Sequence, residues 1–508
     1  MNESRRGFLE TGVGMLGAAA LTGPLAFLRT RQAAEAQEGA RRPADGPCGT
    51  RTRSPYGPVA PKPDQATGLK LLALPEGFEY VSLSWAGDTM DDGNRVPARH
   101  DGMAVVQSRG DEIVLIRNHE FFGLGRPIAA DHNYDERGRG GTTVLHWKNG
   151  KLEGQRVSIS GTVGNCAGGS TPWNTWLTCE ERVEDGDKPH GYVFESTIER
   201  VKNPAPLTAM GRFRHEALAL DPRSGEVFLT EDNSADSENP ADDPRRHGQS
   251  GLFRFVPAKP LGGVGSLAAG GKLYMAQAVD DKGEPVEDLR DPKCFAEYKV
   301  RWVLIEEPDS PAVNRASGPY LQGRSKHATR FQRLEGCWWD PIRHVVLFVD
   351  TDAGPIGSQA DATNRGEGVV WSYDPKSATL KAIFVSQGAL HPSAYGADNP
   401  DNISVSPRGG ILLCEDGGKD DGDGVSLMGL LDDGRTFEFA RNIVEVSRTD
   451  ADALRRAGHD PARIEMGDFS GREWAGATFD PAGRYLFVNI QSPGITFAIR
   501  GPWSKGGF

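Results

Sequence analysis

Short apolar runs bounded by polar residues recur along the chain with similar spacing. Each copy has a polar or acidic residue, a mostly apolar run, a turn that often contains Asp-Pro, a second apolar run and another acid or amide. Six copies are present, at residues 101–120, 166–181, 216–232, 335–350, 401–416 and 473–489. Two apolar strands around a turn rich in Pro and Gly are typical of a β-hairpin. The pattern therefore predicts six hairpins.

The spacing of these hairpins indicates how they assemble. Six hairpins spread over about 390 residues leave room for four strands per repeat. We expect an all-β fold, a six-bladed β-propeller with insertions, in which the hairpins are the inner strands. The two polar ends of a hairpin lie at the same end of its sheet, so acids from every blade would converge on the central channel. Such a cluster of like charges requires cations. The repeat thus predicts a metal cluster in the channel.

The candidate metal ligands at the hairpin ends are almost all carboxylates. They are Glu120, Glu180, Glu181, Glu216, Glu231, Asp232, Glu335, Asp350, Asp352, Glu415, Asp416 and Glu473. Carboxylate oxygens favour Ca²⁺ or Mg²⁺, and also Fe³⁺. No HExxH motif or His pair at ligand spacing is present, which argues against a conventional zinc hydrolase. The alternative is that these acids are ordinary turn and cap residues in exposed loops.

One thiol and one guanidinium stand out beside these acids. Cys166 begins the second repeat within the Gly-rich segment 164–169, where a thiolate among carboxylates would suit iron better than calcium. Arg333 lies two residues before Glu335, so on a strand both side chains face the same way. An Arg beside cations is typical of an anion clamp that holds phosphate. The alternatives are a buried structural cysteine and a surface salt bridge.

Composition narrows the function classes. The chain has 508 residues and a formal net charge of −12, so it has no generic attraction for nucleic acid or anionic lipid. A mean hydropathy of −0.48 excludes a polytopic membrane protein. Its 64 Gly and 34 Pro indicate a turn-rich but folded chain. The even number of cysteines, six, permits disulfides.

The N-terminus has the features of an export signal. Arg5-Arg6 precede an apolar stretch from Val13 to Leu28, and small residues follow at Ala34 and Ala36. This order is typical of a twin-arginine signal peptide, and we expect cleavage after residue 36 and a periplasmic or secreted protein. A basic amphipathic tail or a membrane anchor is the alternative. The expected domains are a signal at 1–36, an extended lead-in at 37–64 and a catalytic propeller at 65–508.

Several longer motifs resemble those of PhoX-type alkaline phosphatases. The most specific are the Cys-containing signature at 161–181 and the C-terminal segments 487–494 and 501–503. Shorter matches are at 211–217, 229–232, 400–402 and 414–417. The resemblance runs from about Asn118 to the C-terminus. It implies a six-bladed propeller and a monomeric enzyme that hydrolyses small-molecule phosphate esters.

The resemblance also implies cofactors and residue roles. The family's cofactor is an oxide-bridged iron pair with several Ca²⁺ ions, so Fe³⁺ and Ca²⁺ are expected here. Carried over by motif, Cys166 and Glu216 would be iron ligands with Glu335 beside them, and the other carboxylates would bind iron or calcium. Arg333, and Asn165 in the Cys signature, would hold the phosphate. The implied chemistry is metal-assisted phosphoryl transfer.

Two other functions are compatible with a Ca²⁺-containing propeller. A Ca²⁺-dependent lactonase or esterase also places acids and Asn in a central channel, but it uses no thiolate. A non-catalytic propeller stabilised by Ca²⁺ would act as an interaction platform. Iron content and phosphate-ester turnover distinguish these functions from a phosphatase.

Overall fold

The computed structural model describes residues 48–183, 185–233, 248–356, 366–388, 396–416 and 424–508. The expected signal peptide at 1–36 and the first part of the expected lead-in lie outside the described residues. The described residues belong to one unit, and antiparallel strands make up most of it. In the described part of the chain, no helix is long and apolar enough to cross a membrane.

Six groups of strands form the blades. The first contains β4 (His100–Arg109), β5 (Glu112–His119), β6 (Gly140–Lys148) and β7 (Lys151–Thr162). The second contains β8 (Asn165–Ser170), β9 (Trp176–Glu180) and β10 (Val193–Ser196). The third contains β11 (His215–Leu220), β12 (Val227–Glu231), β13 (Leu252–Pro257) and β14 (Gly271–Val279).

The other three blades follow the same order. The fourth contains β16 (Leu334–Asp340), β17 (Val345–Asp350), β18 (Val369–Asp374) and β19 (Thr379–Val385). The fifth contains β20 (Pro400–Val405), β21 (Ile411–Glu415), β22 (Ser426–Leu430) and β23 (Thr436–Asn442), extended by β2 (Lys70–Pro75) and β1 (Val59–Pro63). The sixth contains β26 (Trp474–Phe479), β27 (Leu486–Ile490), β28 (Ile495–Arg500) and β3 (Glu79–Trp85).

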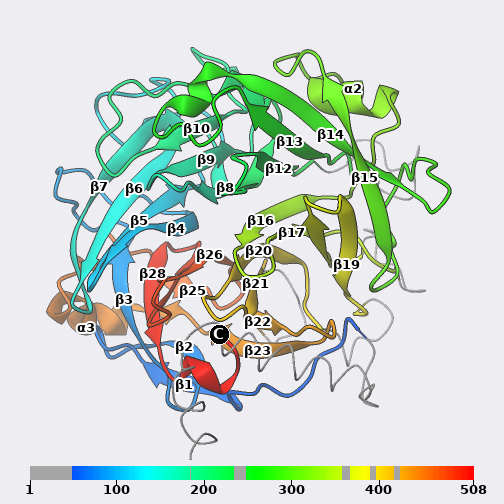
Figure 1. Ribbon diagram of the computed structural model, residues 1–508. Coiled ribbons are helices and arrows are strands. Elements are labelled where there is room, and N and C mark those ends of the chain that lie inside the picture. Colours follow the sequence, from blue (N-terminus) through cyan, green and yellow to red (C-terminus); the bar gives the residue numbers. More distant parts are fainter. Residues whose placement is uncertain (1–47, 184, 234–247, 357–365, 389–395, 417–423) are drawn as a thin grey trace, which may run out of the picture. The chain divides into compact units, whose positions relative to one another are not determined.

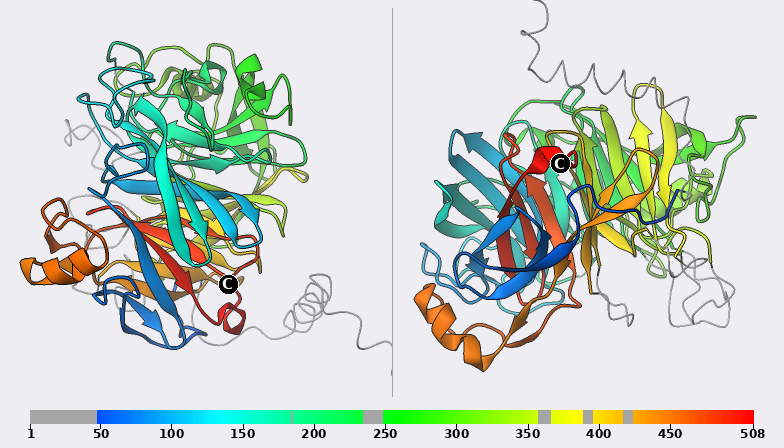
Figure 2. Two further views of the ribbon diagram at one scale, coloured as in Figure 1. Left: turned by 90° about the vertical axis from the view of Figure 1, so that its left-hand side faces the viewer. Right: turned by 90° about the horizontal axis from the view of Figure 1, so that it is seen from below.

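The remaining elements connect or decorate the blades. β15 (Glu297–Ile305) pairs with β14 and β19 and so joins the third and fourth blades into one sheet. The short strands β24 (Glu445–Val446) and β25 (Gly467–Asp468) pair with each other. The helices α2 (Gly318–Ser325) and α3 (Ala451–Arg456) lie at the periphery of the sheets (Figures 1 and 2).

The inner strands close a ring. β4, β8, β11, β16, β20 and β26 each contact the next, and β26 contacts β4 (Figure 1). The last blade is completed by the early strand β3, which pairs with β28. This is the six-bladed propeller that the six repeats predicted, and each repeat forms an inner hairpin. The folded unit begins before residue 65, because β1 lies in the fifth blade.

Local chemistry explains the hairpins. At three turns the Asp of Asp-Pro accepts a hydrogen bond from a turn N–H, as Asp221 does from Arg223, at 2.9 Å. The Asp340 and Asp480 side chains do the same in their turns. The apolar runs that follow these turns are buried between blades, where the side chains of Phe228, Phe348 and Phe487 are fully enclosed. A disulfide joins Cys48 to Cys294 and ties the start of the described chain to the segment before β15.

Candidate metal centre

Each inner strand has a register shift near its start. The first residue inside the shift occupies an equivalent position in all six blades, at the end of the central channel. The shifts lie at His100/Met103, Asn165/Gly168, His215/Leu218, Leu334/Cys337, Pro400/Ile403 and Ala475/Thr478. The first residue inside each shift is Asp101, Cys166, Glu216, Glu335, Asp401 and Gly476, respectively. A β-bulge redirects side chains locally, and bulges are common next to active sites. Five blades thus contribute a side chain of the metal-ligating type from one equivalent position.

A second set of acids comes from the far end of three of these hairpins and from the residue before the sixth. Glu120 follows β5, Glu181 follows β9 and Asp416 follows β21, each as the first residue after its strand. Glu473 immediately precedes β26. We call these four residues, together with Asp101, Cys166, Glu216, Glu335 and Asp401, the channel group.

The channel group forms four overlapping clusters. Within each cluster, one potential ligand atom per residue lies within 4.8 Å of those of the other members. The clusters are Asp101–Glu120–Cys166, Cys166–Glu181–Glu216, Glu216–Glu335–Asp401 and Asp401–Asp416–Glu473. Shared members link them into one row. The Cys166 Sγ lies 3.1 Å from Glu216 Oε1 and 3.9 Å from Asp101 Oδ2, so the thiol is in the middle of the acids.

The electrostatics of this row favour cations. Burial, and then repulsion between neighbouring carboxylates, raises the pKa values of Asp101, Glu120 and Glu216 well above their usual range. The same two causes raise the pKa of Glu181 to about 7, and burial raises that of Cys166 well above its usual value. The Glu216 Oε2 atom is buried and accepts no hydrogen bond from the described residues. A row of carboxylate oxygens and one sulfur, with few hydrogen-bond donors around it, is suited to binding metal ions.

Four predicted ligands occupy a different position. Glu180, Glu231, Asp350 and Glu415 are the last residues of β9, β12, β17 and β21. We call them the strand-end acids. Among the described residues, none of them is a member of the four clusters. Side chains alternate along an extended chain, so each strand-end acid points away from its successor.

The strand-end acids accept hydrogen bonds from backbone N–H groups of neighbouring loops. Glu180 accepts from Val163 at 2.9 Å, Gly191 at 2.8 Å and Tyr192 at 3.1 Å, and its Oε1 lies 2.7 Å from the His190 ring. The other three bind loop backbone in the same way: Glu231 to Gly251, Asp350 to Gln332 and Arg333, and Glu415 to Asp398 and Ser426. These contacts hold loops around the channel in place.

Arg333 lies at the edge of the channel group. Its Nε and Nη2 atoms form two hydrogen bonds with Asp232, at 2.8 and 2.6 Å, and Nη2 lies 2.8 Å from Glu335 Oε1. The side chain remains 25% exposed. Asp232 is therefore bound to the guanidinium rather than to the clusters, and the Asp352 charge also acts on Arg333. Arg333 thus lies next to Glu335, as expected, and it also forms a salt bridge with Asp232.

Asn165 lies inside its blade, away from solvent. It is fully buried, accepts a hydrogen bond from Thr162 Oγ1 at 2.6 Å and donates one to Thr178 Oγ1 at 2.9 Å. Both ends of the amide are therefore engaged by neighbouring strands, and the expected contact with phosphate has no geometric support here.

Three channel residues were missed or misaligned by reading the repeat. Asp101 and Asp401 are the first residues of two repeats. Asp101 belongs to one cluster and Asp401 to two, so their position in the repeat was enough to predict them as ligands. The sequence aligned Glu473 with this position, but the structure puts Gly476 there and Glu473 three residues earlier. Gly476 has a φ of +61° and packs against backbone, since a Cβ atom would lie 2.4 Å from the Asp101 carbonyl oxygen. Gln491 was also missed, and its Nε2 donates to Glu120 at 2.7 Å.

The fold and the site together define a β-propeller protein with a central row of carboxylates and one thiol suited to several metal ions. The family model of alkaline phosphatase PhoX matches residues 54–155 and 147–494. The chain belongs to this family and is a phosphoric ester hydrolase, as the resemblance of its motifs implied. No curated protein matches the sequence significantly.

One solved structure of the family supports the fold. Pseudomonas fluorescens PhoX in complex with vanadate, described as a transition state analogue, superposes with a TM-score of 0.60 at 16% identity, over 90% of this chain and 99% of that one. The PQQ domain of a pyranose dehydrogenase from Coprinopsis cinerea has a TM-score of 0.39 at 10% identity, over 84% and 97% of the two chains. Regucalcin from Agrobacterium tumefaciens, a calcium-binding protein, has a TM-score of 0.35 at 10% identity, over 83% and 96%. Only the first similarity is close enough to bear on the fold.

Proposed function

We propose that the protein is an exported, monomeric phosphatase that hydrolyses small-molecule phosphate esters at a centre of Fe³⁺ and Ca²⁺ ions. The observation that carries this proposal is the continuous row formed by the channel group. Cys166 supplies the soft, charged donor that suits iron, and it lies against Glu216. The carboxylates farther along the row, Asp401, Asp416 and Glu473, are half-buried hard donors suited to Ca²⁺.

When bound, such ions neutralise and polarise the phosphate oxygens. The residues of the chain position the ester for that chemistry. Asp232 fixes the Arg333 guanidinium by two hydrogen bonds through Nε and Nη2, which leaves Nη1 to donate to a phosphate oxygen. Gln491 donates to Glu120 and keeps this carboxylate turned toward Asp101 and Cys166. No step requires a serine or histidine nucleophile.

Elemental analysis of the purified mature protein, combined with an assay on p-nitrophenyl phosphate, tests the proposal. We expect iron together with calcium, and loss of turnover when a chelator removes them. Calcium without iron, with no phosphate-ester turnover, would contradict the proposal and favour a lactonase or a non-catalytic propeller. Replacing Arg333 with Lys keeps a positive charge but loses the planar fork, so we expect it to raise KM for the ester.

Export is tested separately. Arg5 and Arg6 occupy the positions that a twin-arginine receptor reads, so replacing both with Lys should leave the precursor in the cytoplasm. The measurement is immunoblotting of fractionated cells, with the unmodified chain as control. Normal appearance of mature protein in the periplasm would contradict this route.

A further inference from the structure

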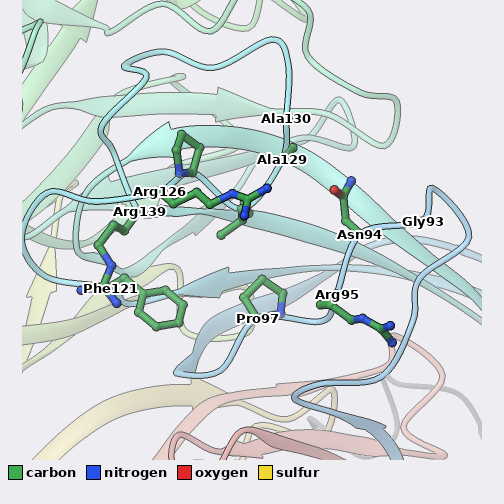
Figure 3. A pocket seen from close by; sticks show the side chains of 11 residues that line it. Gly93, Asn94, Arg95, Pro97, Phe121, Arg126, Ala129, Ala130 and Arg139 are labelled. Atoms are coloured by element: carbon green, nitrogen blue, oxygen red, sulfur yellow. The ribbon is translucent and has the colours of Figure 1, made fainter. Parts of the chain in front are cut away.

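A cavity of about 410 Å³ lies between the loop before β4 and the loop after β5 (Figure 3). Its walls include Arg95, Pro97, Phe121, Arg126 and Arg139. Figure 3 shows the Arg126 side chain extending toward the middle of these residues. The volume is in the range of pockets that enclose small ligands.

The charge of this cavity is opposite to that of the protein. Three of its lining residues are arginines and none is acidic, whereas the whole chain has a net charge of −12. Among the described residues, no carboxylate forms an ion pair with any of these three arginines. Arg139 lies with its guanidinium carbon 5.3 Å from the centre of the Phe121 ring, and Arg95 donates to Thr89 Oγ1. Arginines without anionic partners around one cavity are suited to binding an anion.

The cavity wall is continuous with the channel group. Phe121 is the residue after Glu120, a member of the first cluster. The Glu120 N–H donates to the Arg99 carbonyl at 3.0 Å, and Arg99 is two residues after Pro97 of the wall. Gln491 connects Glu120 of the channel group with the loop before β4, because its side chain donates to Glu120 and accepts from Arg99 Nη1 at 2.9 Å. The channel group and the cavity wall are therefore joined through the adjacent residues Glu120 and Phe121.

We propose that this cavity binds a second phosphate group on the alcohol part of the substrate, so that the enzyme favours esters such as sugar bisphosphates. This inference rests on the proposed function of the channel group. The scissile phosphorus–oxygen bond is hydrolysed at the channel group, and the second phosphate stays on the released alcohol. Arg126 and Arg139 present planar donor pairs that match phosphate oxygens, and Phe121 forms an apolar wall for the carbon skeleton.

The test compares two substrates with one pair of substitutions. The double variant Arg126→Ala/Arg139→Ala removes the two arginines that extend from the loop after β5. We expect the ratio of kcat/KM for fructose 1,6-bisphosphate to that for p-nitrophenyl phosphate to fall about tenfold, since two charge-assisted contacts are lost. Arg137→Ala is the matched control, because Arg137 lies in the same loop, is exposed and is 3.9 Å from Asp187 without lining the cavity. It should leave the ratio unchanged.

Calorimetric measurement of fructose 1,6-bisphosphate binding distinguishes failure of the proposed phosphatase function from failure of the second-phosphate site. If wild-type protein hydrolyses neither substrate, the proposed function fails, and weaker binding by the double variant alone would still support the cavity. If wild-type protein hydrolyses both substrates but the ratio and the binding are the same in the double variant, the second-phosphate site is wrong. Equal losses for both substrates would also contradict it.

Discussion

The channel group and the strand-end acids are neighbours in sequence but have opposite surroundings. Glu180 and Glu181 illustrate the difference, since both are buried and adjacent. Glu180 accepts backbone N–H groups of nearby loops, whereas Glu181 faces Cys166 and Glu216. Burial alone therefore does not distinguish a structural carboxylate from a ligand. The presence or absence of hydrogen-bond donors around it does, because a buried carboxylate without donors requires a cation.

The same contrast recurs in other blades. Burial raises the pKa of Glu231 and of Glu415 to about 8, and N–H groups from Gly251 and from Asp398 and Ser426 oppose that shift. At Glu216 the charged neighbours are other acids, which raise its pKa further. The strand-end acids thus stabilise loops in the metal-free chain, while the channel group destabilises it until metal binds.

The largest expected effect concerns the two cysteines of the second blade. Replacing Cys166 with Ser removes the only thiol in the clusters, and an alkoxide is hard to form near neutral pH. We expect loss of iron and at least a hundredfold fall in phosphatase kcat, since a metal ligand is lost. Iron content by plasma emission spectrometry and turnover of p-nitrophenyl phosphate measure the two effects.

Cys179→Ser is the matched control. Cys179 is buried in β9, one residue before Glu180, and belongs to none of the clusters found among the described residues. This variant should keep its iron and activity and lose about 1–2 kcal/mol of stability. If both variants retained equal amounts of iron, the role of Cys166 as a ligand would be wrong.

The next effect is a pH dependence of stability that should be steeper in the metal-free protein than in the metal-loaded protein. The pKa of Glu181 is raised from 4.5 to about 7 and that of Asp401 from 3.8 to about 7, in both cases first by burial. The folded metal-free protein therefore binds more protons than the unfolded chain between about pH 4 and pH 7, and its stability falls as pH rises through this window. The raised pKa of Glu181 alone corresponds to a loss of about 3 kcal/mol in the free energy of unfolding across this window, at about 1.4 kcal/mol per pKa unit.

Urea unfolding of chelated and metal-loaded protein from pH 5 to pH 8 measures this dependence. Bound cations keep the carboxylates of the channel group ionised in the folded state, so the metal-loaded protein should lose less stability over this range, and what it loses comes from the strand-end acids Glu231 and Glu415. Parallel curves for the two forms would show that the channel group holds no cation.

The smallest effect compares the adjacent pair directly. Glu180→Gln replaces one of two accepting oxygens by an NH₂ group, which cannot accept from the loop N–H donors. We expect a loss of about 2 kcal/mol in the free energy of unfolding with metal content retained. Glu181→Gln should instead lower metal content and activity without destabilising the metal-free protein. Reversed outcomes for the two variants would mean that the inward residue is Glu180.

Much of this protein was predictable from its sequence. The spacing of apolar runs, together with Asp-Pro turns stabilised by local hydrogen bonds, determined the six inner hairpins, and their number determined the ring of blades. The signature around Cys166 was specific enough to indicate the family. These features depend on contacts between residues close in sequence, which a pattern records directly.

Only the tertiary structure decided which acid of each pair faces the channel. A bulge changes the alternation of side chains locally, so the parity that separates Glu180 from Glu181 cannot be counted from the repeat. The cavity with Arg95, Arg126 and Arg139 arises in the same way, because two loops separated by a hairpin meet only after the first blade folds. Ring closure brings six blades to one axis, and that convergence, rather than any local motif, gathers the buried acids and the thiol of the channel group.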